Sequence, residues 1–392
     1  IAIGLGALQT QNFTTATDSY NTAVGHGVGA AITTGTENTL IGAEAGDAIT
    51  TGIRNSALGL GALGSLTEGR SNTAIGRTAL SSDTKGRYNV AVGEDALATQ
   101  NFTTLTSSYN VAVGYAAGTA VTTGVNNVLI GGLAGDALTA TSNNIAIGTL
   151  ALSADTLGGR NVAIGSGALE VQNFTTTTSS YNTAVGFGVG AAVSTGTNNT
   201  LIGGQAGDSI TTGGGNTIIG KGADANSASR NNAIAIGQVV TVAADNRVTI
   251  GSGSNIASLE LDGSDTSWAA SSDERLKENI TDSTAGLSFI NDLRPVTYNW
   301  KKAKDVPNDL PQYIDGSDDP CLGYEYGTEL HGFIAQEVKT VIDNHSDVKD
   351  GQAIWVTDET TVQALAPAAL IPMLVKAIQE LSAEIETLKS GG

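Results

Sequence analysis

The sequence predicts a mainly β fold: a repetitive β-solenoid fibre shaft shared by three identical chains, then a smaller α+β domain that ends in a coiled-coil helix. Three observations carry this prediction. A short motif recurs at a fixed spacing through the first two thirds of the chain. All six prolines, but only 8 of the 51 glycines, lie beyond residue 270. Apolar residues near the end follow steps of three and four. We therefore expect a shaft over residues 1–262 and a second domain over 263–392.

The shaft prediction rests on the repeat Asn, any residue, two apolar residues, Gly. Most steps equal the step from Asn21 to Asn38, and two are longer by four positions, from Asn89 to Asn110 and from Asn161 to Asn182. Such a fixed period is typical of a stacked architecture. The motif begins at Asn21, Asn38, Asn55, Asn72, Asn89, Asn110, Asn127, Asn144, Asn161, Asn182, Asn199 and Asn216.

Each unit is too short for two helices and too rich in Gly and β-branched residues for one. Segments such as "NTAVG" and "NTLIG" predict strands of about four residues ended by a turn glycine. A 17-residue unit then holds two short strands and two turns. We expect a ladder of Asn side chains at one corner and glycines with positive φ at turns. So thin a coil can bury little alone, and the exposed apolar stripe predicts a homotrimer.

The second domain reads as a mixture of elements. Residues 284–295, "TAGLSFINDLRP", predict a helix stopped by Pro295, and 296–300, "VTYNW", predict a strand. Ile334, Val338 and Val341 have helical spacing, and residues 305–327 predict a loop. The final helix carries a seam typical of coiled coils: Ile371, Leu374, Ile378, Leu381, Ile385 and Leu388.

Composition excludes several classes of function. The net charge of −19 argues against nucleic acid as a partner. A single cysteine, Cys321, forbids an intrachain disulfide, and three histidines without a C-x-x-C motif argue against a metal site or a cofactor. No apolar run approaches the ~18 residues of a membrane span. The chain begins at Ile1, so we expect a missing N-terminal part.

Four phrases of the second domain carry a resemblance to a known family: "SSDERLKENI" (271–280), "LRPVTYNW" (293–300), "HGFIAQEV" (331–338) and "LIPMLVKAIQELSAEIETLK" (370–389). They resemble the C-terminal intramolecular chaperone of phage tailspikes and tail fibres, of the endosialidase type. The repeats are similar to trimeric adhesin heads and phage fibre shafts. The resemblance implies that the domain assembles the trimer and then cuts itself off. Ser272 would be the nucleophile, Lys277 its general base, and Ser272–Asp273 the bond cut.

A serine and a lysine can together cut a peptide bond, but the same segment could instead serve as a helix N-cap. A serine hydroxyl needs a base to remove its proton, and lysine serves only when its pKa falls from about 10.4 toward neutrality. A five-residue spacing is not one helix face, so a turn or a neighbouring chain must complete the pair. The alternative is a helix N-cap, in which Ser271 and Glu274 form a capping box. Any catalysis would be single-turnover autoproteolysis without an external substrate.

Aromatic residues mark the insertions of four residues. They are candidate receptor contacts, and the alternative is that they pack the insertion onto the shaft: Phe13, Tyr20, Phe102, Tyr109, Phe174 and Tyr181. The recurring Asp47, Asp136 and Asp208 predict turn caps, with a metal ladder as the alternative.

Together these expectations describe a structural and adhesive fibre of a bacteriophage virion, in the tail or on the capsid, which is extracellular after release. It would bind a host cell-surface receptor or glycan and join other virion proteins through the missing N-terminal part. The alternatives are a bacterial trimeric surface adhesin with the same chaperone, or a polysaccharide-degrading tailspike. The repetitive shaft offers no obvious place for a pair of catalytic carboxylates.

Overall fold

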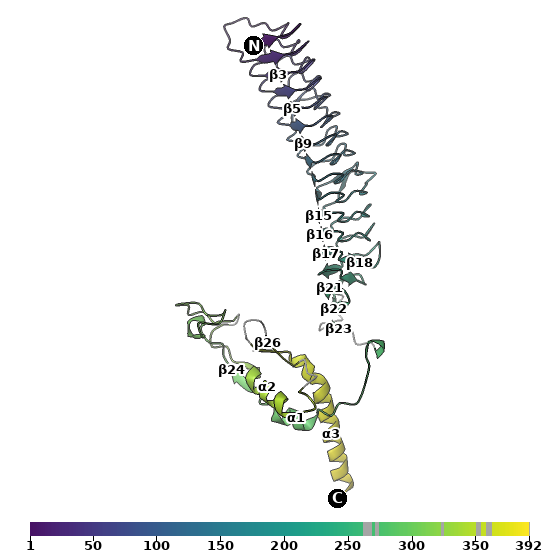
Figure 1. The fold of residues 1–392 in the computed structure, drawn as a ribbon, viewed down its shortest axis with the longest axis vertical. Coiled ribbons are helices and arrows are strands. Elements are labelled where there is room, and N and C mark those ends of the chain that lie inside the picture. Colours follow the sequence, from purple (N-terminus) through teal and green to yellow (C-terminus); the bar gives the residue numbers. More distant parts are fainter. Residues whose placement is uncertain (262–268, 271–273, 323–324, 350–353, 358–362, 392) are drawn as a thin grey trace. The chain divides into compact units, whose positions relative to one another are not determined.

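The chain forms two compact units, Ile1–Ser272 and Asp273–Gly392. The computed structural model describes residues 1–261, 269–270, 274–322, 325–349, 354–357 and 363–391. The first unit, the shaft, is a stack of coils made of short strands and turns, and the second contains the helices (Figure 1). The predicted mainly β solenoid followed by a smaller unit with helices is confirmed.

One strand from each coil joins a single 17-stranded sheet along the shaft. Neighbouring strands pair in parallel and in register, so that Ala23 lies opposite Leu40 and Leu40 opposite Ala57. Only the last two strands run antiparallel to their neighbours. The strands are β1 (Ala2–Ile3), β2 (Thr22–Val24), β3 (Thr39–Ile41), β4 (Ser56–Leu58), β5 (Thr73–Ile75), β7 (Val90–Val92), β9 (Val111–Val113), β10 (Val128–Ile130), β11 (Ile145–Ile147), β13 (Val162–Ile164), β15 (Thr183–Val185), β16 (Thr200–Ile202), β17 (Thr217–Ile219), β19 (Ile234–Ile236), β21 (Arg247–Ser252), β22 (Asn255–Glu260) and β23 (Ala269–Ala270).

The prediction of two strands in every unit is wrong. The side of the coil opposite the sheet is a run of turns, because residues with positive φ interrupt the extended backbone there. Backbone hydrogen bonds still join the coils on that side, as in Gly46 N–H to Ala62 O at 2.9 Å. A second pair of short strands occurs at three places: β6 (Gly86–Arg87) with β8 (Thr106–Ser107), β12 (Gly158–Gly159) with β14 (Thr178–Ser179), and β18 (Asp224–Ala225) with β20 (Thr241–Val242).

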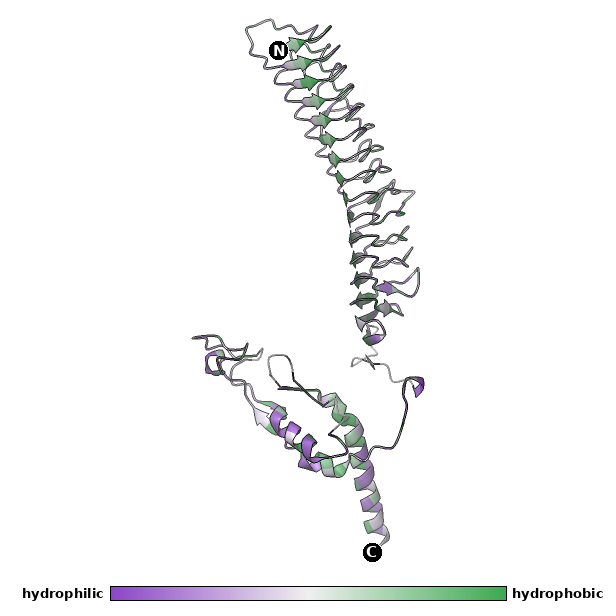
Figure 2. Ribbon diagram, in the orientation of Figure 1, coloured by the Kyte–Doolittle hydropathy of each residue, from purple (hydrophilic) through white to green (hydrophobic). Residues whose placement is uncertain are grey.

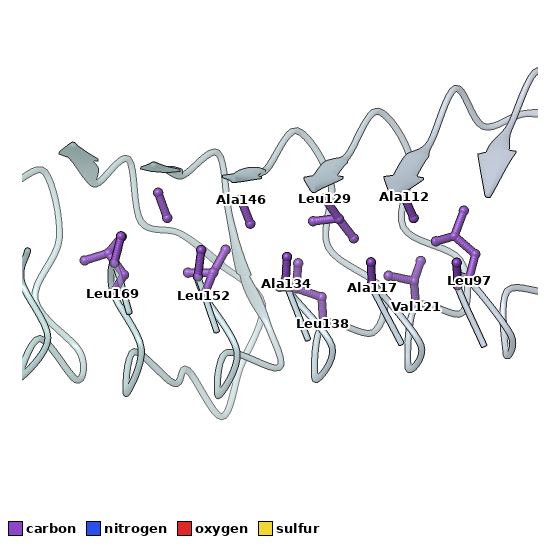
Figure 3. Close-up of a cluster of buried hydrophobic side chains, with 14 of the residues drawn as sticks. Leu97, Ala112, Ala117, Val121, Leu129, Ala134, Leu138, Ala146, Leu152 and Leu169 are labelled. Carbon is purple, nitrogen blue, oxygen red and sulfur yellow. The ribbon is translucent and has the colours of Figure 1, made fainter. Parts of the chain in front are cut away.

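Stacked coils bury an apolar core within a single chain, although each coil is thin. The middle residue of each strand points inward and meets side chains from the turns opposite, as Ala112, Ala117 and Val121 do within one coil (Figure 3). All three are inaccessible to solvent. Because coils stack at about 4.8 Å, successive layers touch and form one continuous dry core. The apolar stripe therefore has two parts, an inner one buried in the chain and an outer one.

Side-chain volumes inside the shaft compensate for one another. Where the strand contributes a leucine, the turn residue six positions later is glycine, as with Leu129 and Gly135. Where the strand contributes alanine, that turn residue is often leucine, as with Ala146 and Leu152. A Cβ on Gly135 would lie 2.8 Å from a methyl carbon of Leu129. Many layers thus hold one of these two combinations, whereas the layers of Ala23, Ala112 and Ala184 have glycine at the turn position.

The C-terminal unit has a separate core around Phe289, Val338, Ile342 and Leu370. Its helices alternate green and purple in Figure 2, as expected of elements with one apolar face. None of the described helices is long and apolar enough to cross a membrane. The elements are η1 (Glu274–Leu276), α1 (Leu287–Asp292), β24 (Val296–Tyr298), η2 (Ala303–Asp305), β25 (Leu330–Gly332), α2 (Ala335–Asn344), β26 (Trp355–Thr357), β27 (Gln363–Leu365), η3 (Pro367–Leu370) and α3 (Ile371–Ser390).

Candidate functional site

The predicted asparagine ladder is present and unbroken. The side-chain oxygen of Asn21 accepts the backbone N–H of Asn38 at 2.9 Å, and the same bond recurs at every step to Ala233. The Asn38 side-chain amide donates to Gly52 O at 2.9 Å. These asparagines are buried, so each needs its partners. The ladder therefore fixes the register between coils.

The glycine that follows each strand is required by close approach of two backbones. Gly131 has φ +134°, and a Cβ placed on it would lie 2.5 Å from the carbonyl oxygen of Gly148 in the next coil. No L-residue fits such a position without moving the chain. The next residue, Gly132, has open space around it. Only the first glycine is therefore a structural requirement.

The two aromatic types of the insertions have different environments. Phe102 and Phe174 are 7% exposed, so they pack the insertion onto the shaft and offer no surface to a receptor. Phe13 is half-buried. Tyr109 and Tyr181 are 53% and 52% exposed, and Tyr20 is also exposed. Of the candidate receptor contacts, the tyrosines alone present their rings to solvent.

Sequence reasoning missed a buried carboxylate in the coil ahead of two of the insertions. Asp83 is inaccessible to solvent and accepts hydrogen bonds from Gln100 Nε2 at 2.7 Å and from the backbone N–H of Gly86 at 3.0 Å. Burial raises the pKa of Asp83, against the effect of these bonds. Asp155 and Gln172 repeat the arrangement at 2.6 Å. The signal was available in "SSDTKGRYN" and "SADTLGGRN", each directly ahead of an insertion.

The acidic turn residues lie in partly buried turns. Burial raises the pKa of Asp47 and of Asp136. Asp208 contacts Asp224, whose pKa burial raises to about 6. Within the described ranges, no three His, Cys, Asp or Glu side chains come together as a metal site would require.

Only part of the predicted cleavage pair can be placed. Ser272 and Asp273 lie outside the described residues, so the geometry of their bond stays a prediction. Lys277 directly follows η1, and its backbone N–H donates to Glu274 O at 3.0 Å. Its side chain is exposed in the single chain. A general base at this position therefore needs burial by something other than the described part of its own chain.

The C-terminal unit is held together by polar links between its helices. The Glu380 carboxylate of α3 accepts the Leu287 backbone N–H at 2.7 Å and so caps the start of α1. His345, which ends α2, lies 2.8 Å from the Asp292 carboxylate at the end of α1. These contacts orient the three helices around the small core.

Two rows of apolar side chains are exposed or half-buried, one in each unit. On the sheet, the third residues of the strands point outward, and Leu58 is 48% exposed. We call this row the strand-face row: Val24, Ile41, Leu58, Ile75, Val92, Val113, Ile130, Ile147, Ile164, Val185, Ile202, Ile219, Ile236 and Ile250. On α3, every residue of the predicted seam is more than 40% exposed, from Ile371 to Leu388. Exposed apolar rows of this length are typical of interaction surfaces.

Comparison with known proteins identifies the C-terminal domain. Residues 272–347 match the model of a peptidase family described as chaperone of endosialidase. No curated protein and no solved structure gives a significant match. The chain thus carries an endosialidase-type C-terminal chaperone domain behind a β-solenoid, a combination that fits a protein of the phage tail-fibre or tailspike type.

Proposed function

We propose that this chain is a homotrimeric fibre of a bacteriophage virion whose C-terminal domain assembles the trimer and then cuts the chain between Ser272 and Asp273. The observation that carries the proposal is the position of the family match. It begins at Ser272, directly behind the solenoid, at the residue that the resemblance assigns as nucleophile. The fibre works outside the host cell, where it binds a surface receptor.

The exposed rows give the proposed trimer its contacts. Three copies that pack through the strand-face row remove an apolar stripe from water along the whole shaft. Three α3 helices that pack through the seam from Ile371 to Leu388 form a short coiled coil. Identical surfaces around a threefold axis close without leaving a free row. Mass measurement of the native particle tests this, and a stable folded monomer would exclude it.

Assembly also supplies what the cleavage chemistry lacks in one chain. Lys277 is exposed, and only burial or a nearby cation brings its pKa toward neutrality. We propose that neighbouring chains bury Lys277 in the trimer, so that its neutral amine takes the Ser272 proton. Attack of this hydroxyl on its own carbonyl would close a four-membered ring, so the Ser272 oxygen of one chain attacks the Ser272 carbonyl carbon of a neighbouring chain. The Asp273 nitrogen leaves with the proton, and water hydrolyses the resulting ester between the two chains. Cleavage therefore follows assembly.

Four chains test the cleavage step. Ser272→Ala removes the nucleophile, and Lys277→Arg keeps the charge but cannot lose its proton. Both should yield an uncut trimer. Ser271→Ala and the unchanged chain should release a fragment that begins at Asp273 and ends at Gly392. Denaturing gels with N-terminal sequencing give the readout. An unchanged chain that stays whole as a trimer would refute self-cleavage but leave assembly intact.

A truncation tests the chaperone role separately. A chain that ends at Ser272 should fail to assemble, because nothing then holds three chains together while their coils stack, and unpaired strand edges stay exposed meanwhile. Sedimentation after refolding gives the fraction in trimers. Equal yields with and without the C-terminal domain would contradict the proposal.

A further inference from the structure

At one corner of the shaft, the residues at equivalent positions of successive coils include large side chains that the backbone conformation there does not favour. The residue before each ladder position has φ between +49° and +72° in every coil. Glycine and asparagine adopt this left-handed conformation at least cost. These positions do use them in several coils, but they also keep large side chains. We call this set the corner column: Tyr20, Glu37, Arg54, Ser71, Tyr88, Tyr109, Asn126, Asn143, Arg160, Tyr181, Asn198, Gly215 and Asn232.

The tyrosines of the corner column are associated with arginines. The rings of Tyr88 and Tyr109 stack, with centroids 5.1 Å apart and planes 8° from parallel. The Arg70 guanidinium lies 5.9 Å from the centre of the Tyr88 ring. One large repeat further along, Arg160 lies 5.4 Å from the centre of the Tyr181 ring. An arginine beside a tyrosine ring therefore occurs twice, and each place has an exposed tyrosine, Tyr109 or Tyr181.

These arginines differ from the others of the shaft in their partners. Four shaft arginines form ion pairs with carboxylates: Arg54 with Glu37, Arg77 with Glu94, Arg230 with Asp245 and Arg247 with Glu260. Arg70, Arg87 and Arg160 have no described carboxylate within the 4.0 Å that defines such a pair. In a chain of net charge −19, carboxylates are abundant. Three arginines beside tyrosines, without a described carboxylate, are therefore an unexpected grouping.

Arg70 and Arg87 are also close to each other. Their backbones form a parallel bridge between adjacent coils, which places two like charges one coil apart. The Nε atom of each is buried and has no hydrogen-bond acceptor within the described chain. Both side chains remain partly exposed. Two guanidinium groups held in place in this way repel one another, and an anion between them would remove the repulsion.

We propose that the two clusters, Arg70–Arg87–Tyr88–Tyr109 and Arg160–Tyr181, are binding sites for an acidic polysaccharide that lies along the shaft. The inference rests on the proposed role as a surface-binding fibre. Guanidinium groups bind carboxylate or sulfate oxygens in pairs. Tyrosine rings offer rigid amphipathic faces to the C–H faces of sugars. Tyr109 and Tyr181 are four coils apart, roughly 19 Å at the spacing of strands, so one linear chain can reach both clusters.

Binding of defined oligosaccharides to the full-length protein tests the proposal. The probes are a long oligogalacturonate that spans both clusters, a short one that covers a single cluster, a heparin fragment of the same long length, and a neutral malto-oligosaccharide. We expect the long acidic probes to bind, the short one to bind more weakly, and the neutral one not to bind. Heparin carries sulfates in addition to carboxylates, so tighter binding of the heparin fragment than of the long oligogalacturonate would indicate sulfate recognition. Failure of both long acidic probes to bind overturns the proposal.

Variants assign the binding to the clusters. R70Q/R87Q should lower the affinity for the long acidic probes by about tenfold or more. R160Q should lower the affinity for the long oligogalacturonate to that for the short one, because only one cluster then remains. R54Q is the matched control, since Arg54 lies in the same column but is paired with Glu37. Equal affinities for R70Q/R87Q and R54Q would refute the assignment.

Measuring the mass of the native particle distinguishes failure of the polysaccharide site from failure of the proposed trimer. The arginine variants should keep the trimer and the self-cleavage of the unchanged chain. If R70Q/R87Q instead dissociates the trimer, the cluster is a contact between chains and the polysaccharide site is refuted. A monomeric unchanged chain would refute the proposed function whatever the binding result.

Discussion

The shaft and the C-terminal unit solve the problem of burial in opposite ways. Each coil of the shaft places a small set of side chains inside and repeats it, so the core continues from coil to coil without contacts distant in sequence. The C-terminal unit collects its core from α1, α2, α3 and a hairpin, and still leaves the α3 seam exposed. The difference teaches that the shaft is stable through local repetition, whereas the C-terminal unit depends on distant contacts and, in our proposal, on other chains.

The strongest test of the shaft is the glycine that follows a strand. Gly131→Ala should lower the free energy of unfolding by about 3 kcal/mol or more, because the new Cβ overlaps the backbone of the next coil at an unfavourable φ. Gly132→Ala is the control and should change little, since a Cβ there meets nothing within 4 Å. Urea unfolding followed by far-ultraviolet circular dichroism gives the values. Similar losses for both variants would contradict the close-approach argument.

Volume compensation between Leu129 and Gly135 predicts a loss of unfolding free energy that a second substitution partly restores. Leu129→Ala should cost about 2–5 kcal/mol through the cavity it leaves. Adding Gly135→Leu gives the coil, which also holds Leu138, the arrangement of Ala57, Leu63 and Leu66. The double variant should recover part of that loss, less about 1–2 kcal/mol for a leucine with positive φ. Leu152, at the equivalent turn position, has φ +56°, so the conformation is accessible. A double variant less stable than Leu129→Ala alone would show that the layers are not interchangeable.

In the C-terminal unit, the hydrogen bond between Glu380 and the start of α1 should contribute more to stability than an exposed residue of the same helix. Glu380→Ala leaves the Leu287 backbone N–H of α1 without its cap and should cost about 1–2 kcal/mol. Glu384→Ala, on an exposed position of the same helix, should be nearly neutral. In a Trp268→Phe background, the two remaining tryptophans report the unfolding of this unit alone by their fluorescence. The comparison would fail if both variants unfolded at the same urea concentration.

The smallest expected effect is a difference in response to acid. Burial raises the pKa of Asp83, Asp155 and Asp224, the last to about 6, so the folded shaft holds these protons more tightly than the unfolded chain. Stability from these groups therefore increases as pH falls through their raised pKa values toward about 4, and for Asp224 this range begins at about 6. Asp83→Asn/Asp155→Asn should reduce this gain.

In the C-terminal unit the sign is opposite. Hydrogen bonds from Lys302 and Lys304 hold the pKa of Asp318 at about 2, and Arg294 lowers the pKa of Glu337. The stability they contribute is present above the unfolded values and is lost as pH falls from about 4 toward 2. Urea midpoints of the two units, measured separately across this range, give the comparison. Parallel curves for the two units would show that these carboxyl groups do not govern acid stability.

Residues required in every coil could be predicted from the sequence, and residues required in only some coils could not. The ladder asparagines and the glycines after the strands recur twelve times or more, so a single physical requirement is visible in the pattern. Asp83 needs Gln100, which lies in the next coil, and their separation along the chain is meaningful only once the coils are stacked. The burial of Phe102 has the same cause. The sequence does not show that most units hold one strand, because turns with positive φ hydrogen-bond to the next coil as strands do.

In the second domain, local elements were predictable and their combination was not. The helix around Val338 and the final helix follow from apolar spacing, and both are present. The cap that Glu380 provides for α1 joins residues 93 positions apart, which no spacing rule indicates. The pairing of Ser272 with Lys277 stays a prediction, because it depends on residues outside the described ranges and on neighbouring chains.

Because the ladder has the same register in every coil, whole repeats can be lost or gained during evolution without disturbing the rest of the shaft. Because every coil presents the same asparagine, the same glycine and the same strand pairing to the next, removing one whole repeat between two ladder positions leaves ends that still match. Each such change in the gene would shorten or lengthen the shaft by about 4.8 Å. Unequal recombination between near-identical repeats produces changes of that kind. The length of the shaft can therefore evolve in whole steps, independently of the C-terminal domain.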